Sequence, residues 1–265
     1  SANFGILIAG ALGLSLLTGP LGCFILWKRM AYFCESLTHS ALLGIALGVI
    51  MGLGMNIGII LSCLIFASLL VWLQSREMFT TDALLGILAH AALAIGVITL
   101  SILGKGEIDL HDILLGNFSA INADNLWQLF TIAMVSLIFI AVCWRQLLLI
   151  TLCADLAKIE RLPLVAINLG FMLLASLTVA VSVQIAGMLL LTSLLIIPAA
   201  SAKLIAKSPL QMVLYASGIA GLSSMSGILL AKFYLLPLGA SIVVMTTVLF
   251  ILIYIGVNIQ RVIDR

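Results

Sequence analysis

Charged side chains are scarce in this sequence of 265 residues. Asp, Glu, Lys and Arg make up only 8% of it, whereas an ordinary soluble domain has roughly 25%. Hydrophobic residues make up 64%, and the mean hydropathy is +1.34. So few charges cannot cover the surface of a water-soluble fold of this length, which excludes soluble enzymes, nucleic-acid-binding proteins and disordered chains. The composition predicts an integral membrane protein.

Cysteine motifs and catalytic motifs are missing as well. The five cysteines are odd in number and form no CxxC pair, so we find neither a disulfide framework nor a thiolate metal site. No GxxxxGK[ST] phosphate-binding loop, GxSxG or HExxH motif is present. The chain is therefore predicted not to be an enzyme, and a separate subunit must hydrolyse ATP if ATP drives its activity. The net charge of +2 is too small to suggest a polyanionic partner.

The hydrophobic residues fall into nine stretches, each near the ~20 residues that a helix needs to cross ~30 Å of hydrocarbon. The ~10-residue alternating segments of a membrane β-barrel do not occur, so the predicted fold is all-α. We interpret the first stretch as a spanning helix and not as a cleaved signal. Pro198 interrupts the seventh, which we expect to be a broken or re-entrant helix. The approximate limits are 4–27, 33–54, 57–73, 83–103, 127–143, 163–181, 185–201, 210–230 and 237–257.

The basic residues predict an outer N-terminus and a cytoplasmic C-terminus. In this orientation ten of the 12 Lys and Arg residues lie in inner loops, and only Lys105 and Lys232 lie outside. The outer loop 104–126 is net acidic and contains His111. We expect the inner loop 144–162 to form a short helix at the membrane surface. No linker or internal repeat is evident, so we predict a single transmembrane domain over residues 1–265.

Two ionisable residues, Glu35 and His39, stand four positions apart at the start of the second stretch. On a helix they share one face, one turn apart, and a carboxylate with an imidazole can hold a divalent transition metal. The alternative is that Glu35 caps the helix near the headgroups while His39 bonds a carbonyl group. Small residues recur at every fourth position beside the pair and let another helix approach closely. They are Ser36, Ser40, Gly44, Gly48 and Gly52.

Asp82 and His90 occupy the fourth stretch. Asp82 follows two threonines at the inner end, where it can cap the helix. His90 lies about 12 Å deeper by helical rise, at a depth similar to that of Glu35 and His39. It is either a metal ligand or a structurally satisfied histidine. One chain offers few donors, but a two-fold dimer would double the Glu35 and His39 pair into a four-ligand site.

Six motifs resemble the metal ABC transporter permease family, the membrane subunits of bacterial zinc, manganese and iron importers. The motifs occur in the order typical of the family and spread over most of the chain. The resemblance is closest to the zinc-uptake permeases, in which a histidine at the position of His90 is characteristic. The motifs are 19–22 (GPLG), 27–33 (WKRMAYF), 35–40 (ESLTHS), 81–90 (TDALLGILAH), 114–117 (LLGN) and 187–203 (GMLLLTSLLIIPAASAK).

This resemblance implies an architecture similar to that of the vitamin B12 and iron-siderophore (type II) ABC importers. Two permeases would work with two cytoplasmic ATP-binding subunits and an extracytoplasmic metal-binding protein, in the bacterial cytoplasmic (inner) membrane. The transported substrate would be Zn²⁺, with Mn²⁺ or Fe²⁺ as the alternative. ATP would bind to the partner subunit, and this chain would bind no cofactor.

The resemblance also implies roles for particular residues. Glu35, His39 and His90 would bind the metal, with Asp82 as a relay on the inner side. The outer gate would contain Leu114, Leu115, Gly116 and Asn117. The helix that couples the permease to the ATPase would contain Asp155, Leu156, Ala157 and Glu160. Two positions depart from the family pattern: Glu35 stands where Asp is usual, and Arg161 stands where relatives have Gly.

Two other function classes fit the sequence less well. A stand-alone transporter, proton-coupled through Glu35 or Asp82, usually has inverted repeats; we find none, and nine stretches do not divide evenly. An intramembrane metalloprotease needs a general base beside two histidines at short spacing, and this sequence has no such arrangement.

Overall fold

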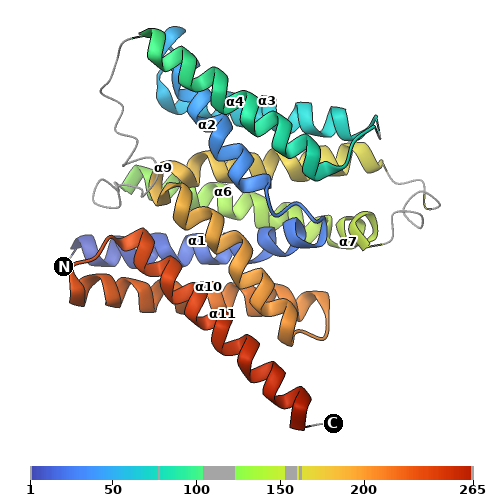
Figure 1. Cartoon of the computed structure of the whole chain (residues 1–265), viewed down its shortest axis with the longest axis vertical. Coiled ribbons are helices and arrows are strands. Elements are labelled where there is room, and N and C mark those ends of the chain that lie inside the picture. Colours follow the sequence, from blue (N-terminus) through green and yellow to red (C-terminus); the bar gives the residue numbers. More distant parts are fainter. Residues whose placement is uncertain (1, 77, 104–122, 153–159, 161–162, 264–265) are drawn as a thin grey trace. The chain divides into compact units, whose positions relative to one another are not determined.

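The computed structural model describes residues 2–76, 78–103, 123–152, 160 and 163–263 (Figure 1). These residues form α-helices joined by short turns, and none of them lies in a β-strand. The predicted all-α fold is therefore confirmed for the part of the chain that the structure describes. The helices are α1 (Ala2–Trp27), α2 (Phe33–Ile50), α3 (Met55–Gln74), α4 (Thr81–Leu103), α6 (Ala123–Val142), α7 (Trp144–Leu152), α9 (Leu164–Ile205), α10 (Pro209–Tyr234) and α11 (Leu238–Ile263).

The described helices supply eight segments long and apolar enough to cross a membrane, or up to nine if a bent pair counts as one span. The bent pair consists of Leu126–Val142 and Trp144–Leu152, which meet at 72°. These segments correspond to the nine predicted stretches. The second member of the pair is α7, so the start of the predicted inner loop is helical, as expected.

The break in α9 lies at Gly187 and not at Pro198, where we expected it. The helix continues through Pro198, but Gly187 has φ 74° and ψ 165°, a backbone conformation that glycine adopts without steric cost. The break lies at the start of the second of two successive apolar spans, Leu164–Val183 and Ala186–Ile205. The interruption predicted at Pro198 is therefore wrong, because neighbouring helices in a membrane protein can compensate for a proline inside a span.

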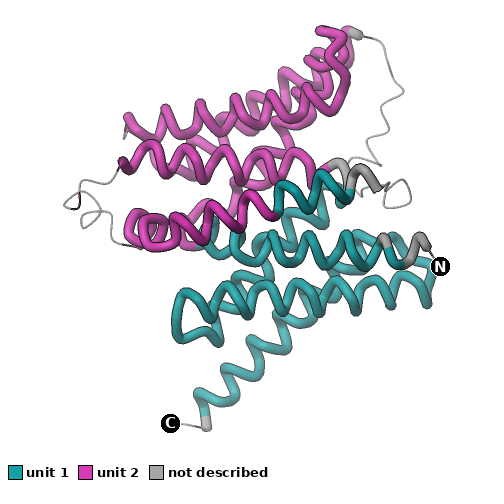
Figure 2. The backbone as a smooth tube through the Cα atoms, turned by 180° about the vertical axis from the view of Figure 1, so that it is seen from behind, with its two compact units in different colours: residues 1–26, 111–133, 184–265 teal, residues 27–110, 134–183 magenta. Residues whose placement is uncertain are grey.

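The chain divides into two compact units (Figure 2). Unit 1, in teal, contains residues 1–26, 111–133 and 184–265, and unit 2, in magenta, contains residues 27–110 and 134–183. Both α6 and α9 begin in one unit and end in the other. The single transmembrane domain over residues 1–265 stays a prediction.

Unit 1 packs its helices through small residues. In α1, a Cβ on Gly22 would overlap the backbone carbonyl of Leu195 in α9, and a Cβ on Gly19 would overlap Ser217 in α10. The hydroxyl groups of Ser15 in α1 and Ser224 in α10 lie 3.1 Å apart and share a hydrogen bond. Membrane helices gain close backbone contact and interhelical hydrogen bonds in this way.

Unit 2 contains the small-residue stripe of α2, which packs against α3. The Ser40 hydroxyl donates to the Ser62 carbonyl at 3.1 Å, and the Ser62 hydroxyl donates back to the Ser40 carbonyl at 2.9 Å. A Cβ on Gly44 would overlap Ser62 and the backbone of Gly58. The stripe therefore lets α3 approach closely, as predicted. Its last member, Gly52, is an exception, because α2 ends at Ile50 and Gly52 lies in the exposed turn beyond it.

We predict that Gly44→Ala destabilises the protein. The added methyl group would overlap the backbone of α3, and overpacking of this kind costs about 1–3 kcal/mol. The measurement is thermal unfolding of the detergent-solubilised protein. The matched control is Gly218→Ala in α10, where a Cβ meets nothing within 4 Å. Equal melting temperatures for the two variants would contradict the close packing of α2 on α3.

Candidate functional site

Glu35 and His39 lie in the first turns of α2, within unit 2. Before the helix, the Phe33 amide donates to the Met30 carbonyl at 2.9 Å. Glu35 is exposed in the first helical turn, where a carboxylate interacts favourably with the positive end of the helix dipole. His39 is half-buried, one turn further along the same face. The helix is unbroken here, so the two residues lie one turn apart on one face of α2; their joint binding of a metal stays a prediction.

Asp82 lies in the first turn of α4, also within unit 2. The capping group of this helix is Thr80: its hydroxyl accepts from the Ala83 amide at 3.4 Å, and its carbonyl accepts from the Leu84 amide at 3.1 Å. The interpretation of Asp82 as the N-cap is therefore wrong, because Thr80 already fills that position. Asp82 is exposed.

His90 is held by its own helix in a defined orientation. The His90 Nδ1 atom lies 2.7 Å from the Gly86 carbonyl oxygen. A carbonyl oxygen only accepts, so Nδ1 carries the proton, and in neutral imidazole the lone pair is then on Nε2. Metal-binding histidines commonly donate their second ring N–H to a carbonyl in this way. His90 is exposed and presents a nitrogen suited to a cation.

Two contacts between α2 and α4 place the histidines at the same level. The Ser36 hydroxyl donates to the Leu85 carbonyl at 3.3 Å, and a Cβ on Gly96 would lie 3.0 Å from the Leu43 amide nitrogen. Ser36 contacts Leu85, and Leu43, later in α2, lies beside Gly96, later in α4. The chain therefore runs in the same direction in both helices. Within the paired segments, His39 is three residues after Ser36 and His90 is five after Leu85. The structure therefore supports the similar depths expected for these two residues.

The histidines nevertheless do not face one another along the contact between the helices. His90 follows Leu85 by five residues, which turns it about 140° away from the face that contacts α2. Within the described ranges, no three His, Cys, Asp or Glu side chains come close enough to hold one ion. A single chain thus presents separate donors at one level and no complete coordination shell.

Several predicted functional residues lie outside the described part of the chain. These are the outer-gate residues Leu114, Leu115, Gly116 and Asn117, the coupling residues Asp155, Leu156 and Ala157, and also His111 and Arg161. Glu160 is described and exposed, and its Oε1 atom lies 3.1 Å from Arg145 Nη2. This pair connects the end of the predicted coupling segment to α7.

Residues 5–256 match the ABC 3 transport family. The chain belongs to this family. It is 40% identical over 249 residues, 94% of this chain and 95% of the relative, to the high-affinity zinc uptake system membrane protein ZnuB of Haemophilus influenzae. It is 29% identical, over 95% of this chain and 89% of the relative, to the manganese import system permease protein ScaB of Streptococcus parasanguinis.

A solved structure supports the fold. The chain is similar to PsaBC from Streptococcus pneumoniae in complex with Fab, with a TM-score of 0.83 and 27% identity over 96% of this chain and 91% of the other. Together with the match over residues 5–256, this confirms the predicted membrane permease of an ABC importer. The fold prediction, an all-helical multi-span permease, is confirmed as well.

We predict that His90 is protonated at Nδ1 in the metal-free protein. The carbonyl of Gly86 at 2.7 Å can only accept, which fixes this tautomer. The measurement is ¹⁵N magnetic resonance of histidine-labelled protein, with His90→Gln to identify the signal by its loss. A neutral ring protonated at Nε2 would contradict the orientation described here.

Proposed function

We propose that this chain is the membrane-spanning subunit of an ATP-driven importer that moves Zn²⁺ into the cytoplasm. The observation that carries the proposal is the 40% identity, over 94% of this chain, to a protein named as the membrane component of a high-affinity zinc uptake system. Two copies of the chain would work with two ATP-binding subunits and an extracytoplasmic metal-binding protein. ATP would be hydrolysed on the partner subunits, and Zn²⁺ would pass through as substrate.

The donors on α2 and α4 suit this cargo. Zn²⁺ binds imidazole nitrogen and carboxylate oxygen, and Glu35, His39 and His90 supply both kinds of atom. His39 and His90 lie at one level, so an ion can meet both at the same stage of its passage. The incomplete shell in one chain favours brief coordination, because an ion enclosed by a full tetrahedral set would leave slowly. Asp82, about 12 Å from His90 by helical rise, would receive the ion on the inner side.

The exposure of these groups supports a dimer. Glu35, Asp82 and His90 are all exposed on unit 2, and ionisable groups at lipid-facing positions are costly. A second copy around a two-fold axis would cover them and would supply a second set of donors. Native mass spectrometry of the complete transporter should find two permease chains, and a complex with one chain would contradict this arrangement.

Coupling to ATP would run through the inner segment after α7. The 72° bend between α6 and α7 turns the chain away from the direction of the span, and Glu160 is held by Arg145 at 3.1 Å. In the predicted orientation this segment faces the cytoplasm, with the N-terminus outside. Closure of the ATP-binding subunits would move it and change which side of the membrane the donors face. Residues 114–117 would form the outer gate.

Manganese is the second candidate cargo. The 29% identity to a manganese import permease over 95% of this chain supports it. The imidazole donors of His39 and His90 favour Zn²⁺, because Mn²⁺ prefers oxygen ligands. Both cargoes require the same kind of complex.

We predict that Glu35→Gln lowers ATP-driven ⁶⁵Zn uptake by at least about tenfold, the loss typical of removing even an outer-shell partner of a metal site. The measurement uses proteoliposomes that contain the complete transporter and its metal-binding protein. The matched control is Glu35→Asp, which keeps the carboxylate and should retain most of the uptake. Wild-type uptake in both Glu35→Gln and His39→Ala would contradict the proposed site. Uptake without the ATPase subunit would contradict the transporter class.

A further inference from the structure

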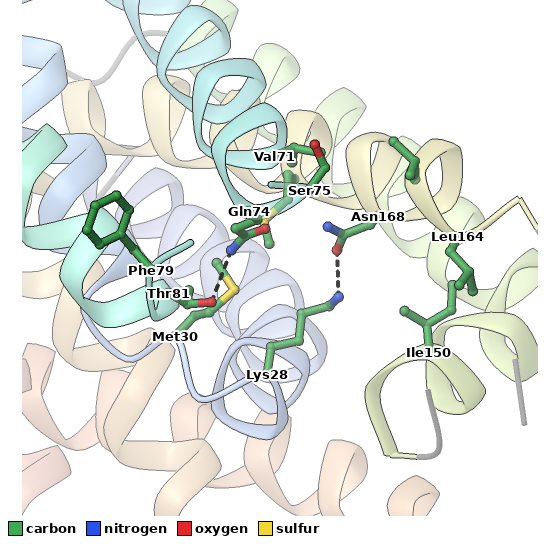
Figure 3. A pocket seen from close by; sticks show the side chains of 12 residues that line it. Lys28, Met30, Val71, Gln74, Ser75, Phe79, Thr81, Ile150, Leu164 and Asn168 are labelled. Atoms are coloured by element: carbon green, nitrogen blue, oxygen red, sulfur yellow. Dashed lines mark hydrogen bonds between the residues drawn. The ribbon is translucent and has the colours of Figure 1, made fainter. Parts of the chain in front are cut away.

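A cavity of about 380 Å³ lies at one end of unit 2, and its lining does not include Glu35, His39 or His90 (Figure 3). It forms where the turn between α1 and α2, the end of α3, the beginning of α4, α7 and the beginning of α9 meet. Polar side chains at this meeting point include Lys28, Gln74, Ser75, Thr81 and Asn168. No role assigned above uses any of these five residues.

Lys28 gives the cavity a positive charge. Its Nζ atom donates to Asn168 Oδ1 at 2.7 Å (Figure 3). It also lies 5.5 Å from the centre of the Phe171 ring. Burial lowers the pKa of the Lys28 ammonium group to about 8. Of the described residues that line the cavity, Lys28 is the only one with an ionisable side chain, and none is a carboxylate. The cation is therefore held by a neutral amide and an aromatic ring, without a carboxylate in the lining to balance its charge.

The surroundings of the cavity also favour an anion. The helices α4 and α9 both begin at its wall, with Thr81 and Leu164, and helix N-termini carry partial positive charge. Arg29 and Arg76, next in sequence to Lys28 and Ser75, are both exposed. Part of the lining is apolar and includes Met30, Phe79, Ile150 and Leu164. A ligand that combines a negative group with hydrocarbon matches this lining.

We propose that this cavity binds a phosphate group, carried either by the headgroup of an anionic phospholipid or by a soluble phosphate. The cavity lies at the ends of membrane-spanning helices, and basic pockets between such helices bind anionic headgroups. The apolar part of the lining favours the lipid source. A bound phosphate would accept from Lys28 and would connect the turn before α2 with the ends of α3, α4 and α9. This inference concerns binding alone and does not depend on which metal is transported.

The test measures the retention of phosphatidylglycerol by the complete transporter, using native mass spectrometry after reconstitution in phosphatidylcholine with added phosphatidylglycerol. We expect Lys28→Gln to weaken retention about fivefold, the effect of one basic residue near a membrane surface. The matched control is Lys203→Gln, which removes an exposed charge at the end of a span in unit 1 and should retain the lipid as the wild type does.

A second variant keeps the test valid if Lys28→Gln folds poorly. Asn168→Asp leaves a carboxylate beside Lys28, which preserves a partner for the ammonium group and repels an anion. We expect this variant to keep its melting temperature and to lose phosphatidylglycerol. Raising the pH above about 8 should weaken retention by the wild type, since Lys28 then loses its charge.

A second experiment distinguishes a lipid headgroup from a soluble phosphate as the ligand. Inorganic phosphate is titrated into the transporter in pure phosphatidylcholine, and the melting temperature is followed. Lipid retention that depends on Lys28 assigns a headgroup, and stabilisation by phosphate alone that depends on Lys28 assigns a soluble ligand. The proposal is overturned if neither lipid retention nor phosphate stabilisation changes in Lys28→Gln and Asn168→Asp.

Discussion

Hydrocarbon offers no hydrogen bonds, and the organisation of this permease follows from that constraint. Most hydroxyl groups of the described residues find a partner within their own helix, because they donate to a carbonyl group about one turn earlier. Ser15 donates to Ala11 in this way and Thr246 to Ile242, both at 2.7 Å. Among the buried side-chain polar atoms that the structure describes, only those of Thr151 and Ser182 have no partner. Glu35, Asp82 and His90 differ from these hydroxyl groups because they are ionisable and exposed. We propose that these residues serve transport.

The same constraint determines how the helices carry these groups. Without a hydrophobic driving force between helices, α2 associates with α3 through the reciprocal bonds of Ser40 and Ser62 and the backbone contact at Gly44. Its contact with α4 brings His39 and His90 to one level. The bond from His90 Nδ1 to the Gly86 carbonyl leaves the lone pair on Nε2, the nitrogen that we propose meets the metal.

Much of the fold could be predicted from the sequence, because the length of an apolar stretch and the thickness of a membrane are directly comparable. The predicted features that failed depend on backbone geometry or on distant partners. Pro198 suggested a break in the helix, but the break lies at Gly187, whose backbone can adopt a positive φ without steric cost. Capping was one of two roles open to Asp82, and Thr80 caps the helix instead. The contact of Lys28 with Asn168 joins residues 140 positions apart and has no local signal. The pair Glu35 and His39 could be predicted because a four-residue spacing on a helix is enough to place both on one face.

We propose that Glu35, His39 and His90 bind the ion as it crosses. X-ray absorption at the zinc edge of the zinc-loaded transporter, free of its metal-binding protein, tests this claim most directly. We predict a first shell of nitrogen and oxygen at about 2.0–2.1 Å with imidazole scattering, which is lost when His39 and His90 are both replaced by alanine. A shell of sulfur at about 2.3 Å, or a spectrum unchanged by the double substitution, would contradict the account.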